Sequence, residues 1–112
     1  MLAESGSRLD VQDVACGGEH RLVLAGELDI ASAPCFEKIA RHICRVKPQR
    51  LVLDLRKLTF LDSSGISVIL ALSKSCRESG QELGLIPGQR QVQRIFALSG
   101  AEALLPFARP GG

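Results

Sequence analysis

The chain has 112 residues, enough for one domain with a single core, and 46% of its residues are hydrophobic. Its 14 basic and 12 acidic residues leave a net charge of +2, which is too balanced for nucleic acid to be the main partner. No stretch reaches the roughly 20 apolar residues of a membrane-spanning helix, and the first ten residues do not resemble a signal peptide. We therefore expect one cytoplasmic domain over residues 1–112, with flexible ends at 1–10 and 108–112 and no direct membrane or nucleic-acid partner.

The thiols and imidazoles of the chain do not form a metal-binding pattern. They are Cys16, Cys35, Cys44, Cys76, His20 and His42. Their spacing is wide and irregular, with no C-x-x-C pair, so we expect no metal and no other cofactor. In a cytoplasmic protein these cysteines should be reduced, and we expect them to be small buried apolar residues.

The first part of the chain predicts a hairpin. Val11–Ala15 reads as a short edge strand that turns back at Gly17 and Gly18 into a stronger strand, Arg21–Gly26. Asp29 follows the exit of that second strand, at the position where a site on the sheet edge would begin.

An amphipathic helix is predicted to follow from Ser32 and Pro34, because proline is tolerated in a first helical turn. Its apolar positions have helical spacing: Phe36, Ile39, Ala40 and Ile43. Pro48 ends it.

Six basic residues fall within 17 positions around the end of this helix: Arg41, Arg45, Lys47, Arg50, Arg56 and Lys57. A solvated helix face with strand flanks explains them, and steering of an acidic partner is the alternative.

The central segment is an apolar run followed by a polar tetrapeptide. Leu51–Leu55 is apolar at nearly every position, which is typical of a parallel strand covered on both faces. The tetrapeptide DSSG at 62–65 precedes a new helical pattern, so Asp62 or Ser63 is expected to cap a helix. Gly65 permits close approach of another segment. A plain cap explains the residue types, but two serines beside an aspartate exceed what one cap requires.

The remaining elements complete an alternation of strands and helices. We expect a helix from Ser63 to about Glu78 ended by Ser79-Gly80, a strand at Glu82–Ile86, a helix bearing Val92, Ile95 and Phe96 and ended by Ser99-Gly100, and a last strand or docked segment at Leu104–Phe107. This alternation predicts an α/β fold, a small mixed and mostly parallel β-sheet flanked by α-helices. In such a sheet Asp29 and Asp62 share one edge.

The polar residues of that edge suit regulation better than catalysis. The sequence has no G-x-S-x-G, Walker, H-E-x-x-H or dinucleotide motif, and Ser63 has no evident base. Asp29 and Asp62 alone are too few oxygen ligands to predict a magnesium site. A phosphate on Ser63 would add about −1.5 to −2 charges beside Asp62, at a helix N-terminus that favours anions. We therefore expect a binding protein rather than an enzyme, with a regulatory hydroxyl at Ser63.

Three segments resemble one known family. GELD at 26–29, LVLDLRKLTFLDSSG at 51–65 and ALSGAEALLPF at 97–107 are similar to STAS domains, and among them to the stand-alone bacterial anti-sigma factor antagonists. The resemblance covers nearly the whole chain, and its middle segment is the most specific. It implies a single STAS domain.

The resemblance also implies a partner-switching role. The unphosphorylated protein would bind an anti-sigma factor serine/threonine kinase and free the sigma factor. Phosphorylation of Ser63 by that kinase would switch binding off, and a PP2C-type phosphatase would restore it. The partner-binding residues implied are Asp29, Asp62, Ser63, Ser64 and Gly65.

Two alternatives remain open. One is a STAS subunit with an assembly role in a transport or stress-sensing complex. The other is a nucleotide-binding or hydrolytic domain with Ser63 as nucleophile, which lacks both a base and a phosphate loop.

Overall fold

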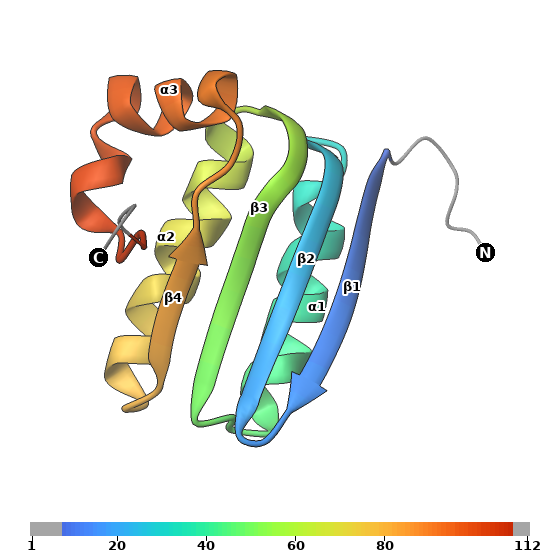
Figure 1. The fold of residues 1–112 in the computed structure, drawn as a ribbon, viewed down its shortest axis with the longest axis vertical. Coiled ribbons are helices and arrows are strands. Elements are labelled where there is room, and N and C mark those ends of the chain that lie inside the picture. Colours follow the sequence, from blue (N-terminus) through green and yellow to red (C-terminus); the bar gives the residue numbers. More distant parts are fainter. Residues whose placement is uncertain (1–7, 109–112) are drawn as a thin grey trace.

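Strands and helices alternate along the chain in the computed structural model, which describes residues 8–108 (Figure 1). The elements are β1 (Leu9–Cys16), β2 (Glu19–Leu28), α1 (Ala33–Arg45), β3 (Arg50–Leu61), α2 (Ser63–Glu78), β4 (Glu82–Ile86), α3 (Arg90–Ser99) and a 3-10 helix, η1 (Ala101–Leu104). The predicted boundaries of α2 and β4 are confirmed. No helix within residues 8–108 is both long and apolar enough to span a membrane.

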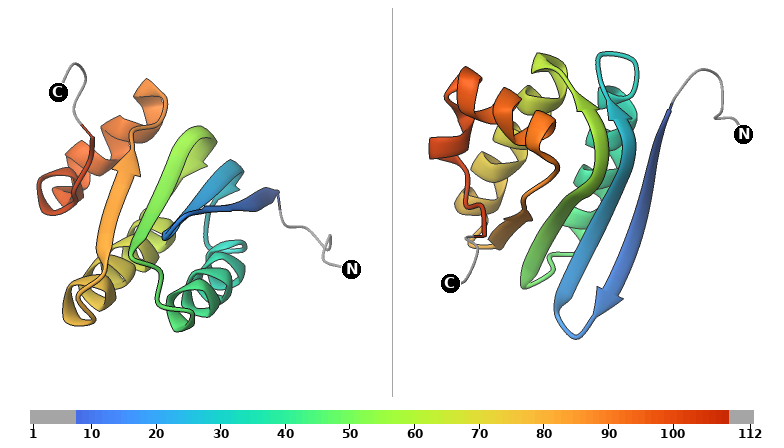
Figure 2. Two further views of the ribbon diagram at one scale, coloured as in Figure 1. Left: turned by 60° about the horizontal axis from the view of Figure 1, so that its bottom comes forward. Right: turned by 45° about the horizontal axis from the view of Figure 1, so that its top comes forward.

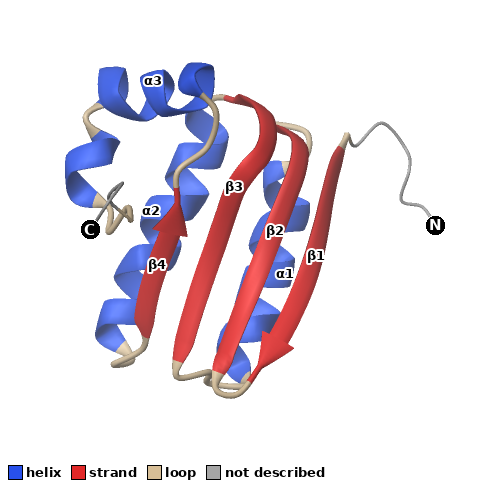
Figure 3. Ribbon diagram, in the orientation of Figure 1, coloured by secondary structure: helices blue, strands red, loops and turns tan. Residues whose placement is uncertain are grey.

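The four strands form one sheet in chain order, β1-β2-β3-β4. The β1–β2 hairpin is antiparallel, whereas β2–β3 and β3–β4 are parallel, so the mixed, mostly parallel sheet is confirmed. Helices α1 and α2 lie on the same face of the sheet, and α3 lies beyond the end of β4 (Figures 2 and 3). Both crossover helices therefore begin at one edge, here called the carboxyl edge, where β2 and β3 end.

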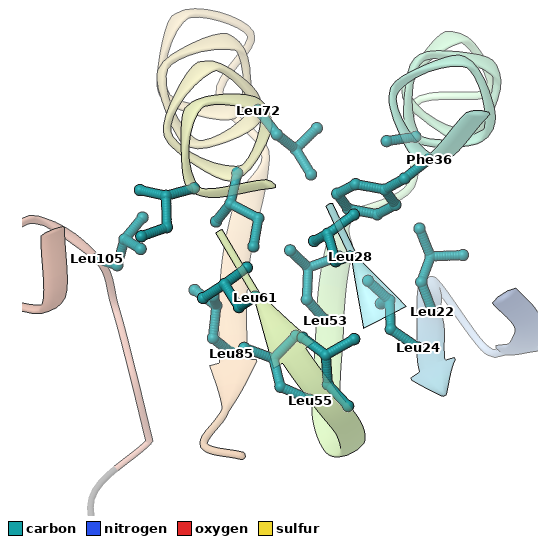
Figure 4. Packing of buried hydrophobic residues seen from close by; sticks show 14 of the residues in the cluster. Leu22, Leu24, Leu28, Phe36, Leu53, Leu55, Leu61, Leu72, Leu85 and Leu105 are labelled. Carbon is teal, nitrogen blue, oxygen red and sulfur yellow. The ribbon is translucent and has the colours of Figure 1, made fainter. Parts of the chain in front are cut away.

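The core lies between the sheet and these two helices. Figure 4 shows leucines of the strands pointing toward Phe36 of α1 and Leu72 of α2. The fully buried leucines of β2 and β3 are Leu22, Leu24, Leu28, Leu51, Leu53, Leu55 and Leu58. Side chains two residues apart on a strand share a face, which accounts for Leu51, Leu53 and Leu55. A register shift after Asp54 in the pairing with β2 returns Leu58 to the same apolar layer. Burial of each such side chain contributes about 1.5 to 3 kcal/mol.

The second face of the sheet has no helix layer in the part of the chain that the structure describes (Figure 3). Every residue of Leu51–Leu55 is nevertheless buried, so the predicted cover on both faces of this strand is confirmed. Side chains cover the central strand there instead. Val52 and Asp54 are each only 4% exposed. The guanidinium of Arg56 donates two hydrogen bonds to the Asp54 carboxylate, at 3.0 and 2.8 Å. These bonds lower the pKa of Asp54, so the carboxylate stays charged although it is buried.

All four cysteines were predicted to be buried, which is confirmed for Cys76 alone; Cys44 is half-buried, and the prediction is wrong for the other two. Cys16 is exposed because it lies on the edge strand β1, and Cys35 is exposed in the first turn of α1. Cys76 of α2 is buried, and burial raises the pKa of its thiol to about 11. Cys44 of α1 lies beside Cys76, and burial also raises the pKa of its thiol. All four are free thiols.

The predicted flexible ends are partly built into the sheet. Leu9 and Asp10 belong to β1, and the backbone N–H of Ala108 donates to a carbonyl of β4. These three residues were expected to be flexible, but they belong to the sheet or are hydrogen-bonded to it. Residues 1–7 and 109–112 lie outside the described residues, so the prediction of flexibility for them is untested.

The segment Leu104–Phe107 docks on the sheet rather than forming a full strand. Leu104 ends η1, and Phe107 forms one parallel bridge with Leu85 of β4. The Phe107 ring packs edge-on against Phe96 of α3, with centroids 5.1 Å apart. This contact ties the C-terminal segment to α3.

Candidate functional site

Two loops meet at the carboxyl edge. Asp29 follows β2 and Asp62 follows β3, as the sequence predicts. The backbone N–H of Ile30 donates to Oδ2 of Asp62 at 3.2 Å. The backbone N–H of Asp62 in turn donates to the carbonyl of Leu28 at 3.2 Å. The two loops are thus joined by hydrogen bonds and not merely neighbours.

Asp62 is the N-cap of α2. Its Oδ1 accepts from the N–H groups of Ser64 at 2.9 Å and Gly65 at 3.4 Å, and its backbone is extended. Ser63, the other predicted cap, is instead the first helical residue and is exposed. Its hydroxyl has no hydrogen-bond partner among residues 8–108. The serine therefore projects outward at the positive end of a 16-residue helix.

The loop between β2 and α1 has its own hydrogen-bond frame. Oδ1 of Asp29 accepts from the N–H groups of Ala31 and Ser32, both at 3.0 Å. The Ser32 hydroxyl donates to the carbonyl of Glu27 at 2.8 Å and accepts from the N–H of Asp29 at 3.0 Å. Ser32 precedes α1 as predicted, but it makes no side-chain cap bond to the helix. Its buried hydroxyl holds the loop together instead.

Gly65 lies beneath the site. A Cβ at this position would be 2.6 Å from Cγ of Leu28 and 2.8 Å from Cδ1 of Leu61. The close approach expected of this glycine is therefore present, and it is an approach to the protein's own core. Ser64 and both site aspartates are half-buried, so Ser63 is the most accessible of the five predicted partner-binding residues. Their contact with a partner remains a prediction.

The site has no catalytic partner for its serine among the described residues. His20 lies at the opposite end of β2, where its Nδ1 is 2.9 Å from a carboxylate oxygen of Asp13, and His42 lies on the exposed side of α1. Asp29 and Asp62 each have an oxygen bonded to backbone N–H groups. No cluster of three metal-ligating side chains occurs within residues 8–108.

Sequence reasoning missed the apolar part of this edge. Ile30, directly after Asp29, is 76% exposed. Phe60, two residues before the Asp62 cap, is 48% exposed. Neither belongs to a periodic apolar pattern, so periodicity does not reveal them. The only available signal was an isoleucine placed directly after GELD in a polar loop.

A small mixed sheet, two helices on one face and an exposed serine at a capped helix start define the domain. Residues 18–109 match the family model of the STAS domain, and the chain belongs to this family. An anti-sigma F factor antagonist from Paenibacillus polymyxa is 33% identical over 89 residues, covering 75% of this chain and 73% of that protein. The family expected from the sequence is thus confirmed.

Solved structures agree with the fold. The crystal structure of an anti-sigma factor antagonist from Mycobacterium paratuberculosis has a TM-score of 0.83 at 21% identity, covering 92% of this chain and 87% of that one. The unphosphorylated form of the anti-sigma factor antagonist SpoIIAA has a TM-score of 0.74 at 21% identity, covering 90% of each chain. At this identity the likeness shows the shared fold, which matches the α/β prediction.

Proposed function

We propose that this protein is an anti-sigma factor antagonist whose binding to an anti-sigma factor kinase is switched off by phosphorylation of Ser63. The observation that carries the proposal is the exposed Ser63 hydroxyl at the start of α2, beside the Asp62 cap. Relatives named as antagonists support the partner class. Because the switch consumes ATP and acts on a sigma factor, it operates in the cytoplasm.

The chemistry needs only a nucleophilic oxygen from this chain. Oγ of Ser63 attacks the γ-phosphorus of ATP, the bond from phosphorus to the β,γ-bridging oxygen breaks, and ADP leaves. The hydroxyl proton passes to a base on the kinase, since neither histidine of the described chain lies at this edge. A PP2C-type phosphatase reverses the change when water attacks the phosphorus, which releases inorganic phosphate and restores the hydroxyl.

The added charge explains how binding is lost without unfolding. Phosphate would bring about −1.5 to −2 charges to an edge that already holds Asp29 and Asp62. The helix N-terminus offsets about 0.3 to 2 kcal/mol of this repulsion inside the domain. A docked partner would face misplaced charge costing several kcal/mol, and each 1.4 kcal/mol is about tenfold in affinity. The domain tolerates the phosphate, whereas the complex does not.

The experiment is phosphorylation by candidate anti-sigma factor kinases with ATP, followed by intact mass measurement. We expect a gain of one phosphate that is absent in Ser63→Ala and retained in Ser64→Ala. Ser63→Asp should lose kinase binding while its circular dichroism stays that of the wild type. Failure of the wild type to bind or be modified by any such kinase, together with co-purification with transport or stress-sensing subunits, would favour the assembly role instead.

A further inference from the structure

Ile30 is an apolar side chain held outward by a fully bonded loop. Its exposed fraction of 76% is the largest among the exposed large hydrophobic residues of the described chain. Each backbone N–H from Asp29 to Ser32 donates a hydrogen bond, to Ser32 Oγ, Asp62 Oδ2, Asp29 Oδ1 and Asp29 Oδ1 in turn. These bonds fix the backbone that carries Ile30, so the loop loses little conformational freedom when a partner covers the side chain.

We propose that Ile30 is the apolar anchor of the partner surface and that the Asp62 carboxylate holds it in place. This inference rests on the proposed function. It adds a residue that determines specificity and a second way in which the phosphate weakens partner binding. The partner would offer an apolar socket for a branched aliphatic side chain. Basic groups would rim that socket, because Asp29 and Asp62 flank Ile30 on either side of the hydrogen-bonded loop.

The Asp62 carboxylate connects the modified residue to the anchor. Its Oδ1 accepts from the first turn of α2, and its Oδ2 accepts from the N–H of Ile30 at 3.2 Å. A phosphate on Ser63 repels this carboxylate and competes for the same N–H groups, those of Ser64 and Gly65. Displacement of Asp62 then frees the Ile30 N–H and loosens the loop. Phosphorylation thus removes the anchor from its binding position as well as adding charge.

Binding measurements test the anchor. Calorimetry with the kinase identified by the mass assay should show that Ile30→Ala raises Kd about tenfold or more, since a central anchor has a large truncation effect. Ile30→Val should recover most of the affinity. The matched control is Val46→Ala, because Val46 is a branched side chain that is 58% exposed at the opposite end of α1. Wild-type affinity in Ile30→Ala, with the wild type binding normally, would overturn the anchor and leave the proposed function intact. Failure of the wild type to bind would overturn both.

Amide hydrogen exchange tests the connection. Phosphorylation of Ser63 should speed exchange of the Ile30 amide about tenfold, as expected when one hydrogen bond is lost. The Ala31 amide, which donates to Asp29, should change much less. Asp62→Ala should reproduce the fast Ile30 exchange without phosphate. Asp62→Asn should do the same, because its single amide oxygen serves the α2 cap and its NH2 group cannot accept from the Ile30 N–H. An Ile30 amide whose exchange is unaffected by phosphorylation would refute the connection.

Discussion

Replacement of Gly65 by alanine tests whether the site rests on close packing. The new methyl group would lie 2.6 Å from Cγ of Leu28 and 2.8 Å from Cδ1 of Leu61, whereas carbon atoms pack at about 3.5 to 4.0 Å. Both leucines are buried, so the helix start must shift by nearly the whole deficit. Overpacking of this kind costs about 1 to 3 kcal/mol, and the better helix propensity of alanine offsets up to about 1 kcal/mol. We expect a net loss of about 1 to 2 kcal/mol.

Urea unfolding followed by circular dichroism measures this loss. Ser67→Ala is the matched control, since Ser67 is exposed on the same helix and its replacement improves propensity without a clash. The double variant Gly65→Ala/Leu28→Ala should be less destabilised than the sum of the single variants, because it removes the crowded atoms. A Gly65→Ala protein more stable than the wild type would refute the packing argument.

Three further predictions concern other parts of the domain. Arg56→Ala should lower the urea midpoint of unfolding at pH 7, because it leaves the buried Asp54 carboxylate without its guanidinium partner. Because the pair lowers the pKa of Asp54, its stabilisation is present above the ordinary aspartate pKa of about 3.9 and is lost as the pH falls through the lower pKa of the folded state. Urea titrations that show the same loss of stability in Arg56→Ala at pH 7 and at pH 2 would contradict this. Gly26→Ala should lower the melting temperature, since φ is 107° and the new Cβ would meet the carbonyl of Arg8; an unchanged melting temperature would count against this. Iodoacetamide at pH 8 should alkylate the two exposed cysteines and spare Cys76, as mass spectrometry can show; modification of Cys76 before unfolding would oppose a buried thiol with a pKa of about 11.

Local signals explain what was predictable from the sequence. The boundaries of α2 follow from the cap at Asp62 and the left-handed Gly80, whose φ is 73°. The apolar run of β3 identified the central strand. Asp29 and Asp62 were correctly placed on one edge because parallel strands end together.

Features that depend on distant contacts were not predictable. The hydrogen bond between Ile30 and Asp62 joins residues 32 positions apart, and neither residue type predicts it. Ser32 has the residue type of a cap, yet its hydroxyl is used by the loop before the helix. An apolar strand cannot reveal whether a helix or a long side chain such as Arg56 covers its second face. β1 is longer than predicted at its start, where Leu9 and Val11 alternate with exposed Asp10 and Gln12 and pack against the core; this short alternation was missed.

The sheet order has a consequence for synthesis on the ribosome. Since each strand pairs with the one made just before it, no strand has to be inserted between two that are already joined. The β1–β2 hairpin can close first, and β3 and then β4 extend the growing edge once α1 and α2 have formed. At about 5 to 20 residues per second, β4 emerges a few seconds after β3. During that interval β3 is the open edge of a three-stranded intermediate, and α2 emerges in time to cover the apolar face beside that edge.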